Sequence, residues 1–103
     1  MTVIIEMEYA IPLDKHEEFT ELLKKRNEAM KGINAVKSIK ILKQTYGGIG
    51  NAFIELWELD SLADVDVFMK EAYAIPEYKD TVAELMSYYD PTGFTRKVWT
   101  QIL

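Results

Sequence analysis

Large apolar side chains occupy both faces of the stretch formed by residues 51–59. Alternate residues of a strand point to opposite sides of the sheet. One side of this stretch carries Phe53, Glu55, Trp57 and Leu59, and the other carries Ala52, Ile54, Leu56 and Glu58. A strand that is apolar on both faces has to be covered on both. The stretch is therefore predicted to be a central strand, and Glu55 interrupts the apolar pattern on its side.

Three other stretches alternate in the same manner and are predicted to be strands. Residues 3–10 are rich in β-branched and aromatic side chains and end before Pro12. Residues 35–46 carry several lysines, as edge strands often do, and residues 94–102 form the last strand. The glycines between the second and third strands are predicted to form a hairpin turn rather than a phosphate-binding loop, because a strand follows them. These glycines are Gly47, Gly48 and Gly50.

The first predicted helix covers residues 14–31, where apolar residues recur at helical spacing. Asp14 and Glu17 stand three residues apart at its start, which predicts a capping box. Gly32 is predicted to end the helix, because glycine adopts the left-handed conformation that commonly terminates helices.

A second helical region is predicted for residues 61–89, again from the spacing of its apolar residues. Ser61 and Asp64 are predicted to cap its start. Pro76 interrupts the region and is predicted to break it, with a new helical turn beginning at the proline.

The predicted order is strand, helix, strand, strand, helix, strand. This βαββαβ order is typical of the α+β ferredoxin-like fold, in which both helices cover one face of a four-stranded antiparallel sheet. We expect residues 1–103 to form a single domain of this kind, since a chain of 103 residues supports one core.

The second face of the sheet has no predicted cover. Ile4, Ile54 and Leu56 would remain exposed there, together with the carboxylates of Glu6 and Glu8. We therefore expect a homodimer in which two copies of the chain pack through this sheet face. Within a dimer the two carboxylates would need cationic partners, because an unpaired buried charge is costly. The candidate partners are Lys37, Lys40, Lys43, Arg96 and Lys97.

The amino-acid composition limits which binding partners and which cellular compartment we expect. The formal net charge is -5 and the cationic residues form no block, which argues against nucleic acid and anionic membranes as partners. Cysteine is absent, so disulfides and thiolate chemistry are excluded and a cytoplasmic location is the simplest expectation. A single histidine without cysteine argues against a transition-metal site.

The chain resembles the dimeric α/β-barrel superfamily, whose branches include antibiotic biosynthesis monooxygenases, heme-degrading monooxygenases, EthD-type proteins and NIPSNAP proteins. The resemblance implies the ferredoxin-like fold, the homodimer, and a pocket between sheet and helices with Trp57 on the helix side. The features that carry it are Ile4-Ile5-Glu6-Met7-Glu8-Tyr9, Phe19-x-x-Leu22-Leu23, Gly32 before the second strand, Trp57 late in the third, and Pro76-Glu77-Tyr78.

The heme-degrading branch uses an asparagine on the first strand, a tryptophan late in the third and a histidine on the second helix. Here Trp57 matches the tryptophan, but the asparagine position falls near Met7 or Glu8. Residues 62–89 contain no histidine. We therefore expect no heme, and no other cofactor.

Glu55 is the leading candidate for a catalytic residue. Beside Trp57 it could serve as a general base, if burial raises its pKa toward neutrality. Its alternative is a structural ion pair with Arg26, which interrupts the apolar stripe of the first helix. His16, the only histidine, could pair with Glu55 as a second catalytic residue, or could simply be packed or solvated at the start of its helix.

Several aromatic residues could line a pocket for a flat hydrophobic or aromatic ligand, with ordinary core packing as the alternative. They are Tyr9, Phe53, Trp57, Tyr73 and Tyr78. Two functions remain open. One is cofactor-independent monooxygenation, or a related proton transfer, on a small aromatic or polyketide-like compound. The other is a non-catalytic module for ligand binding or assembly, in which Glu55 is merely paired.

Overall fold

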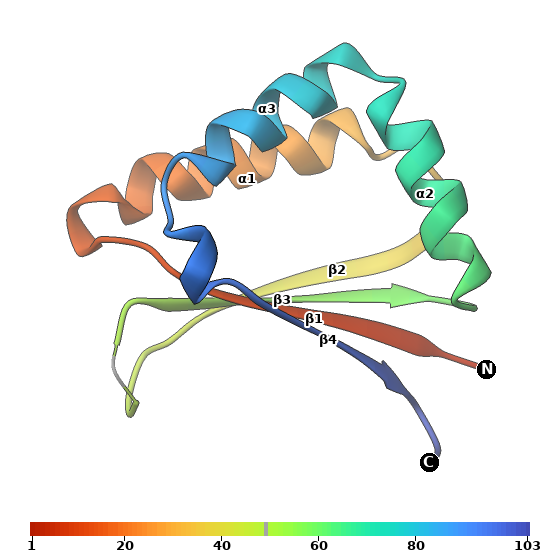
Figure 1. Ribbon diagram of the computed structural model, residues 1–103, viewed down its shortest axis with the longest axis horizontal. Coiled ribbons are helices and arrows are strands. Elements are labelled where there is room, and N and C mark those ends of the chain that lie inside the picture. Colours follow the sequence, from red (N-terminus) through yellow and green to blue (C-terminus); the bar gives the residue numbers. More distant parts are fainter. Residues whose placement is uncertain (49) are drawn as a thin grey trace.

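The computed structural model describes residues 1–48 and 50–103 and follows the predicted order of elements (Figure 1). Short 3-10 turns precede the first helix and the last strand. The strands and helices are β1 (Val3–Ala10), α1 (His16–Ala29), β2 (Val36–Lys43), β3 (Ala52–Leu59), α2 (Ala63–Tyr73), α3 (Pro76–Met86) and β4 (Thr95–Thr100).

The four strands form one antiparallel sheet in the order β2-β3-β1-β4. The two central strands, β1 and β3, place Ile5 opposite Trp57 and Tyr9 opposite Phe53. Figure 1 shows α1, α2 and α3 on the same side of this sheet. The predicted α+β ferredoxin-like class is therefore confirmed.

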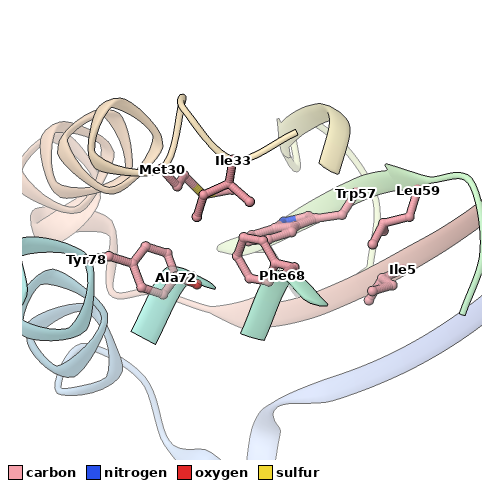
Figure 2. Packing of buried hydrophobic residues seen from close by; sticks show 8 residues of the cluster. All are labelled: Ile5, Met30, Ile33, Trp57, Leu59, Phe68, Ala72 and Tyr78. Carbon is pink, nitrogen blue, oxygen red and sulfur yellow. The ribbon is translucent and has the colours of Figure 1, made fainter. Parts of the chain in front are cut away.

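The helices cover the side of β3 that carries Trp57. Four residues of β3 lie on this side, and each is at most 5% exposed. They are Phe53, Glu55, Trp57 and Leu59. Trp57 belongs to one hydrophobic cluster, drawn in Figure 2, which joins the sheet to all three helices. A second cluster surrounds Tyr9, Phe19 and Phe53 near the start of α1. Full burial of a large apolar side chain is worth about 1.5–3 kcal/mol, so these contacts position the helices on the sheet.

The opposite side of the sheet, here called the outer face, is apolar along its middle. Ile4, Ile54 and Leu56 are half-buried there, while Leu42 and Trp99 are each 51% exposed. The register places Lys40, Leu56, Glu6 and Lys97 in one row across the sheet, so Lys97 on β4 stands opposite Glu6. Arg96, an expected partner for the carboxylates, lies opposite Met7 and points to the helix side.

The predicted side-chain caps are wrong. Asp14 lies inside the 3-10 turn Leu13–Lys15, because the Lys15 amide donates to the Pro12 carbonyl at 2.9 Å, and no side chain caps α1. Ser61 bonds to the Asp64 carboxylate at 3.3 Å instead of capping, and Leu62 is the N-cap of α2. Pro76 breaks the second helical region as predicted, and α3 begins at the proline.

The turn between β2 and β3 has the predicted glycine conformations. Gly47, Gly48 and Gly50 all have positive φ, and so does Asn51 at 63°, which the sequence analysis did not anticipate. Residue 49, within the predicted turn, lies outside the described residues. The strands end earlier than predicted, at Lys43 in β2 and Thr100 in β4.

Candidate functional site

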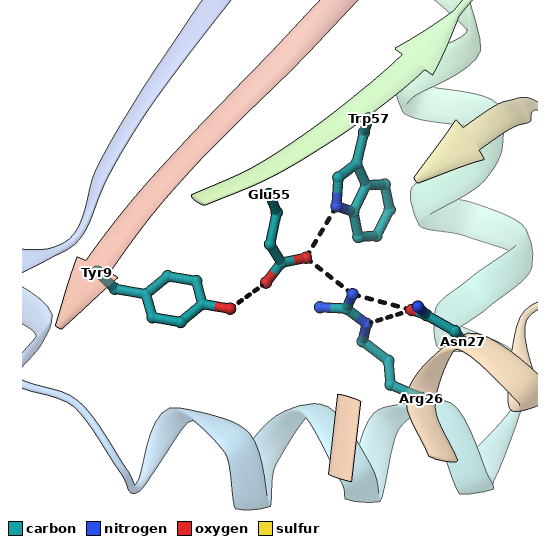
Figure 3. Close-up of polar contacts among 5 residues, drawn as sticks. All are labelled: Tyr9, Arg26, Asn27, Glu55 and Trp57. Carbon is teal, nitrogen blue, oxygen red and sulfur yellow. Dashed lines mark hydrogen bonds and ion pairs between the residues drawn. The ribbon is translucent and has the colours of Figure 1, made fainter. Parts of the chain in front are cut away.

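Glu55 lies at the centre of a buried polar network beneath the helices (Figure 3). Arg26 forms an ion pair with it, with Nη2 2.8 Å from Glu55 Oε1. Trp57 Nε1 donates to the same oxygen at 2.9 Å, and the Tyr9 hydroxyl donates to Glu55 Oε2 at 2.5 Å. The Arg26 guanidinium also donates twice to Asn27 Oδ1, at 3.1 and 2.9 Å.

Strand geometry explains why these groups meet. Glu55 and Trp57 are two residues apart on β3 and therefore share a face. Tyr9 lies on the neighbouring strand β1, diagonally across from Glu55, because its direct partner is Phe53. Arg26 belongs to the last turn of α1, points toward the sheet and is 5% exposed. Its guanidinium carbon lies 5.1 Å from the centroid of the Trp57 ring.

The network keeps the Glu55 carboxylate ionised. Burial alone would raise its pKa, but the Arg26 charge and the hydrogen bonds from Arg26, Tyr9 and Trp57 outweigh burial and lower the pKa. Of the two alternatives for Glu55, the structure therefore shows the ion pair with Arg26 and not a pKa raised toward neutrality. The hydrogen bonds from Tyr9 and Trp57 were not foreseen from the sequence. Burial, followed by the Glu55 charge, raises the pKa of the Tyr9 hydroxyl, which stays protonated and donates.

A cavity of about 310 Å³ lies between the sheet and the helices, and Glu55, Tyr9 and Arg26 form part of its wall. Most of the remaining lining is apolar or aromatic. Burial raises the pKa of Tyr78 to about 12, so this tyrosine also lines the cavity as a neutral hydroxyl. A pocket of this size with a few polar groups suits a small, largely apolar molecule.

The structure brings four of the five predicted pocket aromatics to the cavity. Tyr9, Trp57, Tyr73 and Tyr78 line it, and Tyr73 is 42% exposed, which places this residue at the rim. Phe53 does not line the cavity, although it shares the strand face of Glu55. It packs instead against Phe19, at a centroid distance of 5.4 Å, and against His16 at 4.9 Å.

His16 is buried but does not join the Glu55 network. Its Nε2 donates to the Ile11 carbonyl at 2.7 Å. Its Nδ1 is buried without a partner among the described residues. His16 is therefore packed at the start of α1, which is one of its two expected alternatives, and it does not pair with Glu55.

Residues 86–96 supply a part of the cavity wall that was not predicted from the sequence. Tyr89, Phe94 and Arg96 line the cavity, as does Met86 on α3. The alternation of β4 was a usable signal, because it separates Arg96 from Lys97 by face. Without the register between β4 and β1, however, this alternation could not show whether Arg96 or Lys97 points toward the helices.

The donor set of the site does not fit a histidine-ligated heme. Neither histidine nor cysteine occurs in the described lining of the cavity. Within residues 1–48 and 50–103, no three histidine, aspartate or glutamate side chains gather as a metal site would require. Over the same residues, no helix has the length and apolarity needed to cross a membrane.

Comparison with known proteins gives matches in structure alone. No family model matches the chain, and no curated protein matches its sequence. A NIPSNAP family protein from Agrobacterium tumefaciens superimposes with a TM-score of 0.79 at 13% identity, over 99% of this chain and 94% of that one. An antibiotic biosynthesis monooxygenase-type protein from Nitrosomonas europaea superimposes with a TM-score of 0.77 at 12% identity. This match covers 98% of this chain and 90% of that one.

A third match is SnoaB, a cofactor-independent oxygenase from Streptomyces nogalater, with a TM-score of 0.74 at 9% identity. The match covers 97% of this chain and 92% of that one. At these identities the comparisons establish the fold. The chain therefore has the ferredoxin-like fold of NIPSNAP and antibiotic biosynthesis monooxygenase-type structures, which confirms at the level of fold the resemblance seen in its sequence.

Proposed function

We propose that the chain is a cofactor-independent oxygenase that acts on a small aromatic compound held in the cavity. The observation that carries this proposal is the position of Glu55, the one carboxylate in the described lining of a mostly apolar and aromatic cavity. The cofactor-independent oxygenase of the same fold adds support. An activated phenol or quinol fits this site, because its reaction with oxygen requires only a base and a dry pocket.

In the proposed reaction Glu55 accepts the proton that the substrate loses. The Tyr9 hydroxyl lines the cavity and donates to Glu55, so it can take the substrate proton while passing its own to the carboxylate. The substrate carbanion then gives electrons to molecular oxygen, and a carbon–oxygen bond forms. The resulting peroxide anion takes back the proton held by Glu55, which restores the carboxylate. The O–O bond then breaks as water leaves with the second hydrogen of the same carbon, and a carbonyl group remains. Because Arg26 lowers the pKa of Glu55, this base requires a substrate with an acidic proton.

The proposal predicts that Glu55→Gln abolishes turnover. The amide keeps the shape of the side chain but cannot accept the proton, so we expect a loss of about 100-fold or more. Oxygen uptake with a panel of naphthohydroquinones measures turnover. Glu28→Gln, which removes an exposed carboxylate of α1, serves as the matched control and should keep full activity.

Turnover by a folded Glu55→Gln variant at the wild-type rate would remove Glu55 from the mechanism. The near-ultraviolet circular dichroism of the variant reports whether its core remains packed. This readout matters because the substitution leaves the buried Arg26 charge without its partner.

A second candidate function is non-catalytic binding of the same class of ligand. The observation that favours it is the completeness of the Glu55 network, in which three donors hold both carboxylate oxygens. Under this function no member of the hydroquinone panel would be consumed, while ligands would still bind in the cavity. The Glu55→Gln experiment and a binding measurement therefore separate the two candidates.

We also propose that the chain forms a homodimer through the outer face. Support comes from the half-buried Ile4, Ile54 and Leu56, and from the exposed Leu42 and Trp99 on the same face. Apolar side chains gathered on one face favour association, and two copies of that face can pack about a two-fold axis. Lys97, which stands opposite Glu6 in the register, supplies a cation on that face.

A further inference from the structure

The charges that line the cavity do not balance. Two guanidinium groups, Arg26 and Arg96, and one carboxylate, Glu55, belong to its described lining. Burial raises the pKa values of the lining residues Tyr9, Tyr78 and Tyr89, so these three hydroxyls stay neutral near pH 7. The cavity of a protein with a formal net charge of -5 therefore has an excess positive charge.

Arg26 is not the source of this excess. It is buried, it lies 2.8 Å from the Glu55 carboxylate, and it donates to Asn27. Its charge is therefore paired within the protein, and its Nε and Nη2 groups already donate to Asn27 and Glu55. A ligand that displaced these contacts would leave Glu55 buried without a counter-charge, which is costly.

Arg96 is the source of the excess charge. On β4 it lies opposite Met7, which turns its side chain to the helix side and into the lining of the cavity. Its guanidinium carbon lies 5.6 Å from the Phe94 ring centroid. Within the described part of the chain, no ion pair or side-chain hydrogen bond involves Arg96. Arginine can stack on an aromatic ring and still present its N–H edge to a carboxylate.

The neighbouring aromatic rings define where a flat ligand would lie. Tyr9, Tyr89 and Phe94 are nearly parallel, with interplanar angles of 22°, 7° and 19° and centroid distances between 4.9 and 6.1 Å. All three line the cavity, and Arg96 stands beside the last of them. A planar ring that packs against this wall can bring an acidic substituent to the guanidinium.

We propose that the cavity selects a planar aromatic compound that carries an anionic group, and that Arg96 binds this group at the rim. The inference rests on the proposed function and names its substrate class. The aromatic part of the ligand then extends inward toward Tyr9 and Glu55. Arg96 acts as a specificity-determining residue through a charge-assisted hydrogen bond, while the apolar lining holds the ring.

Binding of naphthoate and naphthamide tests this proposal, because the two probes have nearly the same shape and differ in charge. Isothermal titration calorimetry measures both affinities. We expect the wild type to prefer naphthoate, and Arg96→Gln to lose about tenfold in affinity for naphthoate with naphthamide unchanged, as one partly exposed charge-assisted contact predicts. Arg96→Lys should restore most of the affinity, since it keeps the charge.

Lys97→Gln is the matched control. It removes one positive charge from the same strand, but its side chain lies on the outer face opposite Glu6. Its affinity for naphthoate should stay within about twofold of the wild type, because solvent and salt screen a charge outside the cavity. An equal loss in both Arg96→Gln and Lys97→Gln would mean that net charge alone attracts the anion, and would overturn the role of Arg96.

Different experimental results would contradict this inference and the proposed function. Equal wild-type affinity for naphthoate and naphthamide would overturn anion selection and leave oxygenation of a neutral aromatic compound intact. Equal weakening of both probes by Arg96→Gln would show that Arg96 only supports the cavity wall, which also overturns the inference. Normal naphthoate selection together with absent turnover would instead support the inference and contradict the enzyme proposal.

Discussion

Glu55 shows how partners determine the chemistry of a single residue. Its position on a strand predicted that it would be buried, and burial alone would have made it a weaker acid. Arg26, Tyr9 and Trp57 reverse that effect, and the carboxylate stays charged at 3% exposure. Breaking a buried pair of this kind by removing one partner costs about 3–5 kcal/mol, so the network also contributes to stability.

The lowered pKa of Glu55 predicts a pH dependence of stability. Below its ordinary value of 4.5, the unfolded chain binds a proton that the folded protein does not, so the free energy of unfolding rises with pH there. The contribution is complete above about pH 4.5 and is lost as pH falls through the lower pKa of the folded state. Urea denaturation between about pH 3 and about pH 7 measures this slope.

The control for this measurement is Glu55→Gln, which should show a flatter stability profile below about pH 4.5. The lowered pKa values of Glu18 and Asp90 do not confuse the comparison, since both groups are exposed and are present in both proteins. Identical pH slopes in the two proteins would show that the network does not hold the carboxylate ionised.

At the scale of elements, periodicity predicted more than capping chemistry did. All four strands and the break at Pro76 follow from alternation, helical spacing and the fixed φ of proline, which are properties of the local chain. The two predicted caps failed for different reasons, and at Ser61 the hydroxyl donates to the Asp64 carboxylate instead of capping α2. In the first case Pro12 directed the chain into a 3-10 turn before Asp14 could cap the helix.

Asn51 provides a test of the β2–β3 turn. Its φ of 63° lies in the left-handed region, which asparagine tolerates and alanine does not. Asn51→Ala should therefore lower the free energy of unfolding by about 1 kcal/mol, while Asn51→Gly should change it little. Thermal or urea denaturation of both variants measures the difference. Equal stability of the alanine and glycine variants would contradict the assigned backbone conformation.

At the scale of the whole molecule, three helices lie on one side of a sheet that is apolar on both (Figure 1). The helix side encloses the cavity and the Glu55 network. The outer face carries the half-buried Ile4, Ile54 and Leu56 on its two central strands, and the proposed homodimer would cover them. The two faces of the sheet thus have separate expected roles. The helix side is expected to bind a ligand, and the outer face is expected to bind a second copy of the chain.

Ile54→Asp should convert the proposed dimer into a monomer. Ile54 lies on the central strand β3 in the middle of the outer face, so a carboxylate there would lose its hydration on association. Light scattering at micromolar concentration measures the mass. Val67→Asp makes the same change at an exposed apolar residue of α2 and should leave the dimer intact. A monomeric wild-type protein would contradict the assembly itself.

The sequence by itself determined the order of the elements, the residues that share each strand face, and the presence of two apolar faces on one sheet. These features follow from local periodicity, which a single chain displays directly. It also identified Arg26 and Glu55 as the two groups that interrupt apolar patterns on different elements. It could not show that Tyr9 and Trp57 would add two further donors to their pair.

Only the tertiary structure decided that the Glu55 face meets the helices, that His16 stays outside the network, and that Arg96 opens into the cavity. Strand alternation shows which side chains of one strand share a face. Turning the strand over would exchange the two faces of the sheet and leave the alternation unchanged. The choice between the two faces depends on contacts between distant parts of the chain. The candidate site consists of such contacts, because β1, α1, β3, α2, α3 and the segment ending in β4 each supply a wall of one cavity.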